Sequence, residues 1–277
     1  ARSAQAGCEP QCLEWIAAQG RIDAGTPAQF KKVFARLGKR KLPILIDSAG
    51  GSVDDAIAIG RLVRAKGLDV VVTQTSFQPC AKADAGCRKL EAGGVHPALP
   101  RARLSKCASS CAFILAGGSR RFVGPATFVG LHQVASFQVQ TRVLNTYRVT
   151  TRYQWGVPVE QKKMLIAQKK VGETRKETAT TEKTYARIKA YFVEMGVAES
   201  VMALLMSAPH SSIRILTAAE LTATALATER LHGEHLLLGT ASGTAVLAGF
   251  RPPAGAFDPN TIGIQSLCGQ LAGFALW

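Results

Sequence analysis

Short, continuous apolar runs alternate with amphipathic stretches along the first half of the chain. The runs carry apolar residues without interruption, as strands buried on both faces of a sheet do. The amphipathic stretch between two of them follows Ser52 and ends at Gly67, a capped start and a glycine stop. The pattern predicts an α/β fold with a parallel sheet and right-handed crossovers. The expected elements are strands at 14–22, 42–47 and 68–73 and helices at 26–37 and 53–66.

The alternation changes in the second half. Residues 75–106, rich in Pro, Gly, Cys and basic residues, predict a surface insertion pinned by disulfides. Apolar residues at alternate positions on both sides of a turn at 156–158 predict a long, exposed β-hairpin over 137–170. Brief apolar runs between Gly and Pro in 229–277 predict a small β-rich tail. Between hairpin and tail we expect helices at about 175–195, at 198–206 and from 217, and strands at 213–216 and 226–228.

The chain of 277 residues carries a net charge of +15, with basic residues concentrated between Arg142 and Lys189. Such a charge is compatible with an acidic partner or an anionic membrane surface. Nucleic acid is not favoured, because the sequence has no zinc-finger spacing and no aromatic-interleaved RNA motif. A solvated basic face is the simplest interpretation. No run of apolar residues is long enough to span a membrane.

Seven cysteines occur mostly as close pairs, which favours disulfides and an oxidising compartment. Zinc is disfavoured, because no pair has knuckle spacing and no histidine pair completes a tetrahedral set. The cluster at 232–235 does not predict a helix that would place His232 and His235 on one face, and no further ligand is evident, so no metal or other cofactor is expected. The candidate disulfide cysteines are Cys8 and Cys12, Cys80 and Cys87, and Cys107 and Cys111, with Cys268 alone.

A serine and a histidine are placed where nucleophilic catalysis needs them. Ser109 stands at the first turn of a predicted buried helix, and His132 lies on the apolar strand predicted at 128–132. A hydroxyl at a helix start and an imidazole on a neighbouring strand are the two parts of a Ser–His nucleophile. Ser110 is an alternative nucleophile, and the alternative role for Ser109 is that of an N-cap or a small core residue. The two flanking cysteines are expected to be structural.

Four ordered stretches resemble the ClpP-type serine peptidases of the ClpP/crotonase superfamily. Residues 48–52 resemble the Ser-Pro-Gly-Gly loop of that family, and residues 108–113 resemble its Ala-Ser-Met-Gly-Ala-Phe nucleophile turn. Residues 129–133 resemble its Met-Ile-His-Gln strand, and residues 216–228 its closing segment. The flanking cysteines resemble an exported, periplasmic branch. The resemblance covers about 13–228 and implies a repeated β-β-α spiral with a projecting hairpin and helix as a handle.

The resemblance implies residue roles as well. Ser109 would be the nucleophile, His132 the general base, and the N–H groups of Gly51 and Ser110 the oxyanion hole. The family places an aspartate just before the closing strand, but residues 207–212 contain no carboxylate. Ser211 and His210 are the candidates for the third member. Without an acid, the enzyme would be a dyad, would use an acid from elsewhere, or would have lost activity.

The organisation expected from these observations is a ClpP-like domain with an appended tail. The domain spans 13–228, with the insertion at 75–106 and the handle at 137–195, and the extension at 229–277 packs on it. We expect a homo-oligomer that acts on peptides or proteins outside the cytoplasm, in the periplasm or secreted, after loss of an N-terminal signal or anchor. No ATPase partner is expected there.

Three functions compete at this stage. The favoured one is a serine hydrolase, most simply a peptidase, that works through an acyl-enzyme. The second is a catalytically weakened or inactive protein of the same fold that acts in binding or assembly, which the missing carboxylate favours. The third is crotonase-type acyl-CoA chemistry, which is disfavoured because matched acid/base glutamates are absent.

Overall fold

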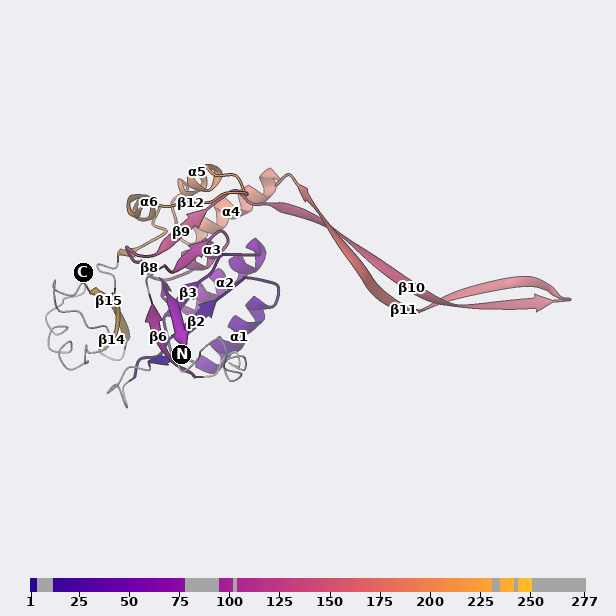
Figure 1. Cartoon of the computed structure of the whole chain (residues 1–277), viewed down its shortest axis with the longest axis horizontal. Coiled ribbons are helices and arrows are strands. Elements are labelled where there is room, and N and C mark those ends of the chain that lie inside the picture. Colours follow the sequence, from indigo (N-terminus) through magenta and orange to yellow (C-terminus); the bar gives the residue numbers. More distant parts are fainter. Residues whose placement is uncertain (4–11, 78–94, 102–103, 231–234, 242–243, 251–277) are drawn as a thin grey trace. The chain divides into compact units, whose positions relative to one another are not determined.

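The computed structural model describes residues 1–3, 12–77, 95–101, 104–230, 235–241 and 244–250 (Figure 1). The chain divides into two compact units. We call Val134–Tyr185 the hairpin unit, and the rest of the chain, Ala1–Gln133 with Ala186–Trp277, the core unit.

A five-stranded parallel sheet in the order β13-β8-β4-β3-β2 is the largest sheet of the described residues. Ile44, Leu45 and Val71 in its middle strands are fully buried, because both faces of the sheet are covered. The predicted α/β class and parallel sheet are confirmed, but the last strand begins after the predicted 226–228. The strands are β2 (Ile16–Gln19), β3 (Ile44–Asp47), β4 (Val70–Val72), β8 (Arg121–Val123) and β13 (Glu229–Arg230).

A second, three-stranded sheet in the order β12-β9-β7 holds the strands that precede the candidate serine and histidine. Its strands are β7 (Lys106–Ala108), β9 (Phe128–Leu131) and β12 (Arg214–Ile215). Strands β7 and β9 are parallel, with Ala108 opposite Gly130, whereas β12 runs antiparallel to β9. The segments after β7 and after β9 therefore leave the sheet at the same edge.

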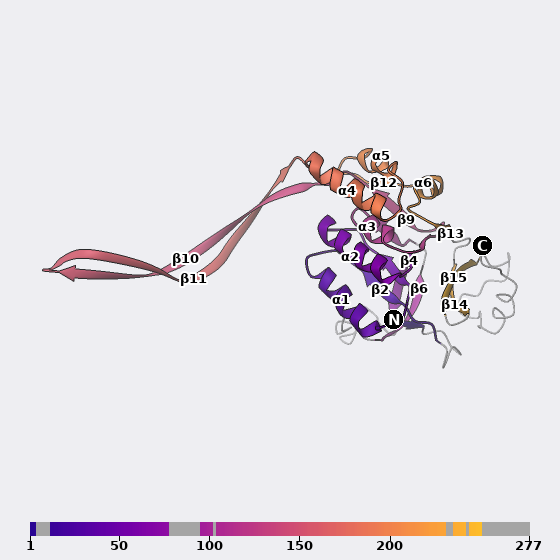
Figure 2. The same ribbon diagram turned by 180° about the vertical axis from the view of Figure 1, so that it is seen from behind.

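Helices α1 and α2 lie side by side next to the parallel sheet (Figures 1 and 2). The first and last residues predicted for α2 are confirmed. The Ser52 hydroxyl accepts the N–H of Asp55 at 3.3 Å, and Gly67 has the left-handed backbone conformation that ends a helix. The capping box of Thr217 and Glu220 is also present. The helices are α1 (Thr26–Leu37), α2 (Val53–Lys66), α3 (Cys111–Ala116), α4 (Glu182–Glu194), α5 (Val201–Met206) and α6 (Ala218–Ala223).

The short helix α3 is buried along its whole length. It packs closely on α2, since a Cβ at Gly117 would come within 2.3 Å of the carbonyl oxygen of Gly60. The Tyr191 hydroxyl of α4 donates to the carbonyl oxygen of Phe113 at 2.6 Å, and burial raises the pKa of this tyrosine. These contacts fix the helix that follows the candidate serine.

Two arginines hold the carboxyl end of α3. Arg64 and Arg121 each donate to the carbonyl oxygens of Ala116, Gly118 and Met195, at 3.0 to 3.3 Å. Burial, and then the charge of Arg64, lower the pKa of Arg121 to about 10. Guanidinium groups suit this position because the exposed carbonyls of a helix end carry partial negative charge.

The ends of the predicted insertion form a third sheet in the order β1-β6-β5. Its strands are β1 (Arg2–Ser3), β5 (Gln74–Phe77) and β6 (Pro97–Arg101). The indole N–H of Trp15 donates to the Thr75 hydroxyl at 2.9 Å and ties this sheet to the core. Residues 78–94, with Cys80 and Cys87, lie outside the described residues.

The hairpin unit consists mainly of two long antiparallel strands, β10 (Ser136–Gln154) and β11 (Val157–Thr178) (Figure 1). Trp155 and Gly156 form its two-residue turn with φ of 54° and 76°, as a type I′ turn requires. The prediction that the hairpin ends at 170 and that a helix begins near 175 is wrong: the ladder continues to the pair Ser136 and Thr178. Pairing in the ladder satisfies the backbone N–H and C=O groups of residues 175–178. This outweighs the local preference of these residues for a helix.

Two further strands, β14 (His235–Ala241) and β15 (Thr244–Phe250), form an antiparallel hairpin, so the described part of the tail has the predicted β structure. Residues 251–277 lie outside the described residues. None of the helices in the described ranges has the length and apolar character needed to cross a membrane.

Candidate active site

The three sequence motifs follow strands that end on the same side of the core unit. The glycine loop follows β3, Ser109 follows β7, and His132 follows β9. Ser48, just after β3, forms a parallel bridge with Cys107 of β7, and β7 is parallel to β9. The carboxyl ends of all three strands therefore point the same way, which is where α/β proteins build their sites.

Ser109 stands on a sharp turn between β7 and α3. Its φ is 56°, in the left-handed region that costs a residue with a side chain about 1–2 kcal/mol. Its N–H donates to the carbonyl oxygen of Gly130 at 2.8 Å, which ties the turn to β9. Ser109 is half-buried, whereas Ser110 is 1% exposed and its hydroxyl has no hydrogen-bond partner. The hydroxyl that a ligand can reach is thus that of Ser109.

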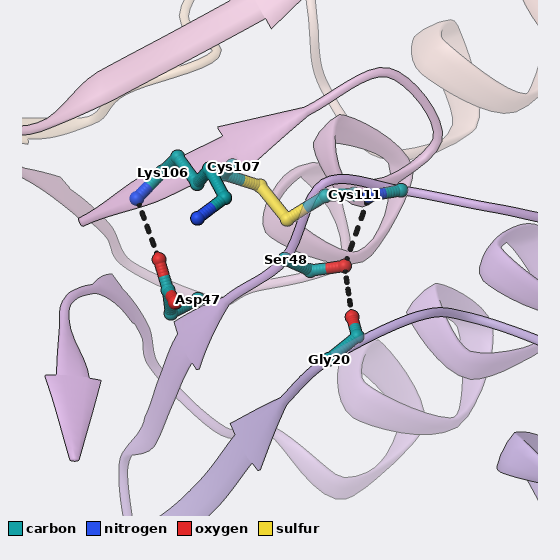
Figure 3. Close-up of a disulfide and its surroundings, with 7 residues drawn as sticks. Gly20, Asp47, Ser48, Lys106, Cys107 and Cys111 are labelled. Atoms are coloured by element: carbon teal, nitrogen blue, oxygen red, sulfur yellow. Dashed lines mark hydrogen bonds between the residues drawn. A yellow bond between two sulfur atoms is a disulfide. The ribbon is translucent and has the colours of Figure 1, made fainter. Parts of the chain in front are cut away.

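A disulfide joins the two sides of this turn. Cys107 in β7 and Cys111, the first residue of α3, are fully buried and bonded, with their Cα atoms 5.1 Å apart (Figure 3). The predicted structural role of this pair is confirmed. Cys12 is also disulfide-bonded, and Cys8, Cys80, Cys87 and Cys268 lie outside the described residues.

The glycine loop packs directly against the serine turn. The Ser48 hydroxyl donates to the carbonyl oxygen of Gly20 at 2.6 Å and accepts the N–H of Gly50 at 3.0 Å (Figure 3). A Cβ at Gly50 would lie 2.8 Å from the Cβ of Ser109, and one at Gly51 would lie 2.0 Å from the carbonyl oxygen of Ile22. Both positions therefore require glycine, because a side chain at either would collide with neighbouring atoms.

Two N–H groups beside the serine are free. Within the described ranges, the N–H groups of Gly51 and Ser110 donate to no protein acceptor. A hollow of about 300 Å³ adjoins the loop, and its lining includes Gly51, Asp47 and Lys106. Unpartnered N–H groups next to a nucleophile are what an oxyanion hole supplies. The arrangement therefore suits the roles predicted for Gly51 and Ser110.

His132 is half-buried and oriented by the main chain. Its Nδ1 lies 2.7 Å from the carbonyl oxygen of Gln133. A carbonyl only accepts, so Nδ1 carries the proton and Nε2 keeps the lone pair that a general base needs. The Gln133 N–H in turn donates to the carbonyl oxygen of Ala208 at 2.9 Å, and its side chain donates to that of Met206.

The segment in which the sequence lacks a carboxylate thus supports His132 indirectly. Ser211 is exposed and His210 is half-buried, and the partner that Nδ1 has in the structure is the carbonyl of Gln133. Sequence reasoning missed this role of Gln133 and of Ala208. Every residue has a main-chain carbonyl, so no motif in the sequence could have indicated this role.

The described ranges contain no group of three or more metal-ligating side chains. His235 lies in β14, and His232, the other histidine of the cluster at 232–235, lies outside the described residues.

The chain is similar in structure to a membrane-bound protease and to ClpP1. A mutant of the membrane-bound stomatin-specific protease 1510-N matches with a TM-score of 0.43 and 13% identity, over 79% of this chain and 79% of that one. A second mutant of 1510-N, in complex with a substrate peptide, matches with a TM-score of 0.43 and 14% identity, over 79% of this chain and 74% of that one. ClpP1 from Listeria monocytogenes matches with a TM-score of 0.42 and 14% identity, over 79% of this chain and 91% of that one. No protein-family model and no curated protein sequence matches the chain.

Proposed function

We propose that this protein is a serine hydrolase, most simply a peptidase, with Ser109 as nucleophile and His132 as general base. The observation that carries the proposal is the parallel register of β7 and β9, which brings these two residues to the same edge beside two unpartnered N–H groups. A catalytic serine on a left-handed turn after a strand is a recurrent hydrolase device.

The proposed reaction passes through an acyl-enzyme. The Ser109 oxygen attacks the substrate carbonyl carbon while Nε2 of His132 takes the hydroxyl proton. The N–H groups of Gly51 and Ser110 stabilise the oxyanion that forms. The imidazolium then returns its proton to the leaving amine as the carbon–nitrogen bond breaks. Water, deprotonated by His132, finally hydrolyses the ester and restores the serine hydroxyl.

The carbonyl of Gln133 supplies part of what a triad acid supplies. When an amide replaces the acid of a triad, the histidine takes the wrong tautomer and turnover falls about 10⁴-fold. Here the carbonyl enforces the correct tautomer, because it accepts the Nδ1 proton. It carries no charge, so it stabilises the imidazolium less than a carboxylate does. We therefore propose a slow dyad rather than a full triad.

Labelling with a fluorophosphonate tests this proposal. We expect the wild-type protein to be labelled and Ser109→Ala to show no labelling. The matched control is Ser110→Ala, which keeps the N–H of residue 110 and should retain labelling. His132→Ala should slow labelling at least about 100-fold. Labelling that persists in Ser109→Ala would contradict the assignment of Ser109 as nucleophile. Cleavage of an unfolded protein by the wild type would identify the activity as that of a peptidase.

A second candidate function is a binding or assembly protein that keeps the fold without turnover. The observation that favours it is the neutral partner of His132. An unlabelled but folded wild type, whose biological role survives Ser109→Ala, would select this alternative.

We also propose that the protein works in an oxidising compartment, such as the periplasm. The support for this is the buried disulfide of Cys107 and Cys111 together with the bonded Cys12. Trapping free thiols in cells at the time of lysis tests it: modification of either member of the buried pair would contradict the proposal.

A further inference from the structure

The end of the hairpin unit exposes a group of large apolar side chains. Trp155 in the turn is 94% exposed, and Tyr153, Val157 and Val159 beside it are 64%, 60% and 52% exposed. Met164, Leu165 and Ile166 further along β11 are also exposed. Solvent exposure of so many neighbouring apolar side chains marks an interaction surface.

Positive charge surrounds this apolar tip. Residues 136–178 contain nine lysines and arginines against three glutamates, a net charge of +6. Four of the basic residues flank the tip and are exposed: Arg148, Arg152, Lys162 and Lys163. Lys163 pairs with Val149 and Lys162 with Thr150 in the ladder. At about 3.3 Å per residue, Arg152 lies roughly 10 Å behind the turn, and Arg148, Lys162 and Lys163 lie roughly 20 Å behind it.

The two strands need a partner on physical grounds. A two-stranded ribbon covers neither face and is marginally stable in water by itself. Its outer edges are open, and they cannot enter the hydrocarbon of a bilayer because unsatisfied backbone groups are too costly there. Insertion of the turn to the depth of the headgroups, about 5–10 Å, buries Trp155 with its neighbours Tyr153, Val157 and Val159 and leaves the strand edges behind them in water.

We propose that residues 148–166 bind the surface of an anionic lipid bilayer, with Trp155 and its apolar neighbours inserted at headgroup depth. Arg152 then lies at the level of the anionic headgroups, where a basic residue contributes about 1 kcal/mol. Arg148, Lys162 and Lys163 follow roughly 10 Å further out, about one Debye length from the surface. Trp and Tyr suit this boundary, since their rings are apolar with a polar group at the edge.

Charge favours a bilayer over the other occupants. Two copies of the hairpin, each with a charge of +6, would repel each other, whereas anionic lipid would neutralise the charge of one hairpin. Nucleic acid would neutralise the charge but would leave Val157 and Val159 exposed to water.

Vesicle binding tests the proposal on the full chain. The measurement is sedimentation with vesicles of phosphatidylcholine alone and with vesicles that contain phosphatidylglycerol. We expect binding to the anionic vesicles at least about 30-fold stronger than to neutral ones. The double variant Lys162→Glu/Lys163→Glu should lose at least about tenfold, and Trp155→Ala should lose about tenfold as well.

The chain supplies a matched control. Lys31 and Lys32 are adjacent, exposed lysines on α1, so Lys31→Glu/Lys32→Glu changes the net charge equally. This variant should bind anionic vesicles within about twofold of wild type, and so should Ser109→Ala. Equal losses in the two charge variants would overturn the proposal, because the effect would then be one of net charge. Unchanged vesicle binding by Trp155→Ala would contradict the proposal that the end of the hairpin inserts into the headgroups.

The remaining outcomes assign the tip to another occupant. Self-association that Trp155→Ala abolishes, without vesicle binding, would assign it to a second copy. Binding of duplex DNA that Lys162→Glu/Lys163→Glu abolishes, without vesicle binding, would assign it to nucleic acid. Either outcome overturns the proposal, and neither depends on whether the protein is a hydrolase.

Discussion

The serine turn and the hairpin turn both place a residue with a side chain at positive φ, but they hold it in different ways. Ser109 is held by a disulfide, by a hydrogen bond to Gly130 and by contact with Gly50. Trp155 is held only by its own hairpin ladder, next to a glycine with open space around it. The first conformation is determined by a local disulfide together with residues far apart in the sequence, the second by its immediate neighbours.

This difference suits the two regions to different roles. A buried, over-determined turn keeps strain that the rest of the fold supports, which suits a group that must be preorganised. An exposed ribbon with no core of its own suits recognition of an outside surface. Substitutions of the same kind should therefore have large effects at the serine turn and small ones at the hairpin turn.

The largest effect is expected for Gly51→Ala. The new Cβ would lie 2.0 Å from the carbonyl oxygen of Ile22, so the loop must move and its N–H with it. Loss of one oxyanion donor typically costs 10²–10³-fold, so we expect fluorophosphonate labelling of Ser109 to fall at least about 100-fold. Circular dichroism checks that the variant is folded. A folded variant that labels at the wild-type rate would contradict the role of this N–H group.

Removal of the disulfide comes next. In Cys107→Ala/Cys111→Ala, the turn at Ser109 can relax from its left-handed conformation, because that conformation costs about 1–2 kcal/mol. We expect labelling to slow about tenfold with unchanged secondary structure. Reduction of the wild type by dithiothreitol should give the same rate, and the variant should not respond to the reductant. A variant as fast as wild type would show that main-chain contacts alone hold Ser109.

Gly156→Ala is the matched substitution in the hairpin. Gly156 has φ of 76° and no atom within 4 Å of its would-be Cβ, so only the backbone conformation is penalised, by about 1 kcal/mol. We expect amide exchange in β10 and β11 to speed up about fivefold, while labelling of Ser109 stays within about twofold. A large change in labelling would mean that the two regions are coupled.

The smallest effect concerns an exposed ion pair at the edge of the core unit. The backbone N–H of Thr217, then the side chains of Arg214 and Thr217, lower the pKa of Glu220 from 4.5 to about 2. A lowered carboxyl pKa stabilises the fold above pH 4.5, and this contribution is lost as the pH falls toward 2.

Urea denaturation at several pH values measures this contribution. The free energy of unfolding of wild type should exceed that of Glu220→Gln by a constant amount above about pH 5. The difference should shrink as the pH falls below 4.5. A difference that does not depend on pH would contradict the assignment of the stabilisation to the carboxylate.

Local patterns predicted much of the fold. The helix at 53–66, its Ser52 cap and the capping box at Thr217 were predicted as they are found, because each depends on residues within one turn. The disulfide of Cys107 and Cys111 is also a local contact. The end of β11 was not predicted, since a ladder of many pairs outweighed the helix preference of residues 175–178.

Residue types and their order along the chain point to the groups proposed for chemistry: a serine, a histidine and two glycines. How these groups are supported follows from contacts that the fold creates. The carbonyl of Gln133 faces Nδ1 of His132, and Gln133 is held by the carbonyl of Ala208. Every residue has a carbonyl and an N–H, so main-chain partners leave no trace in residue types. They become specific only when distant segments are brought together by the fold.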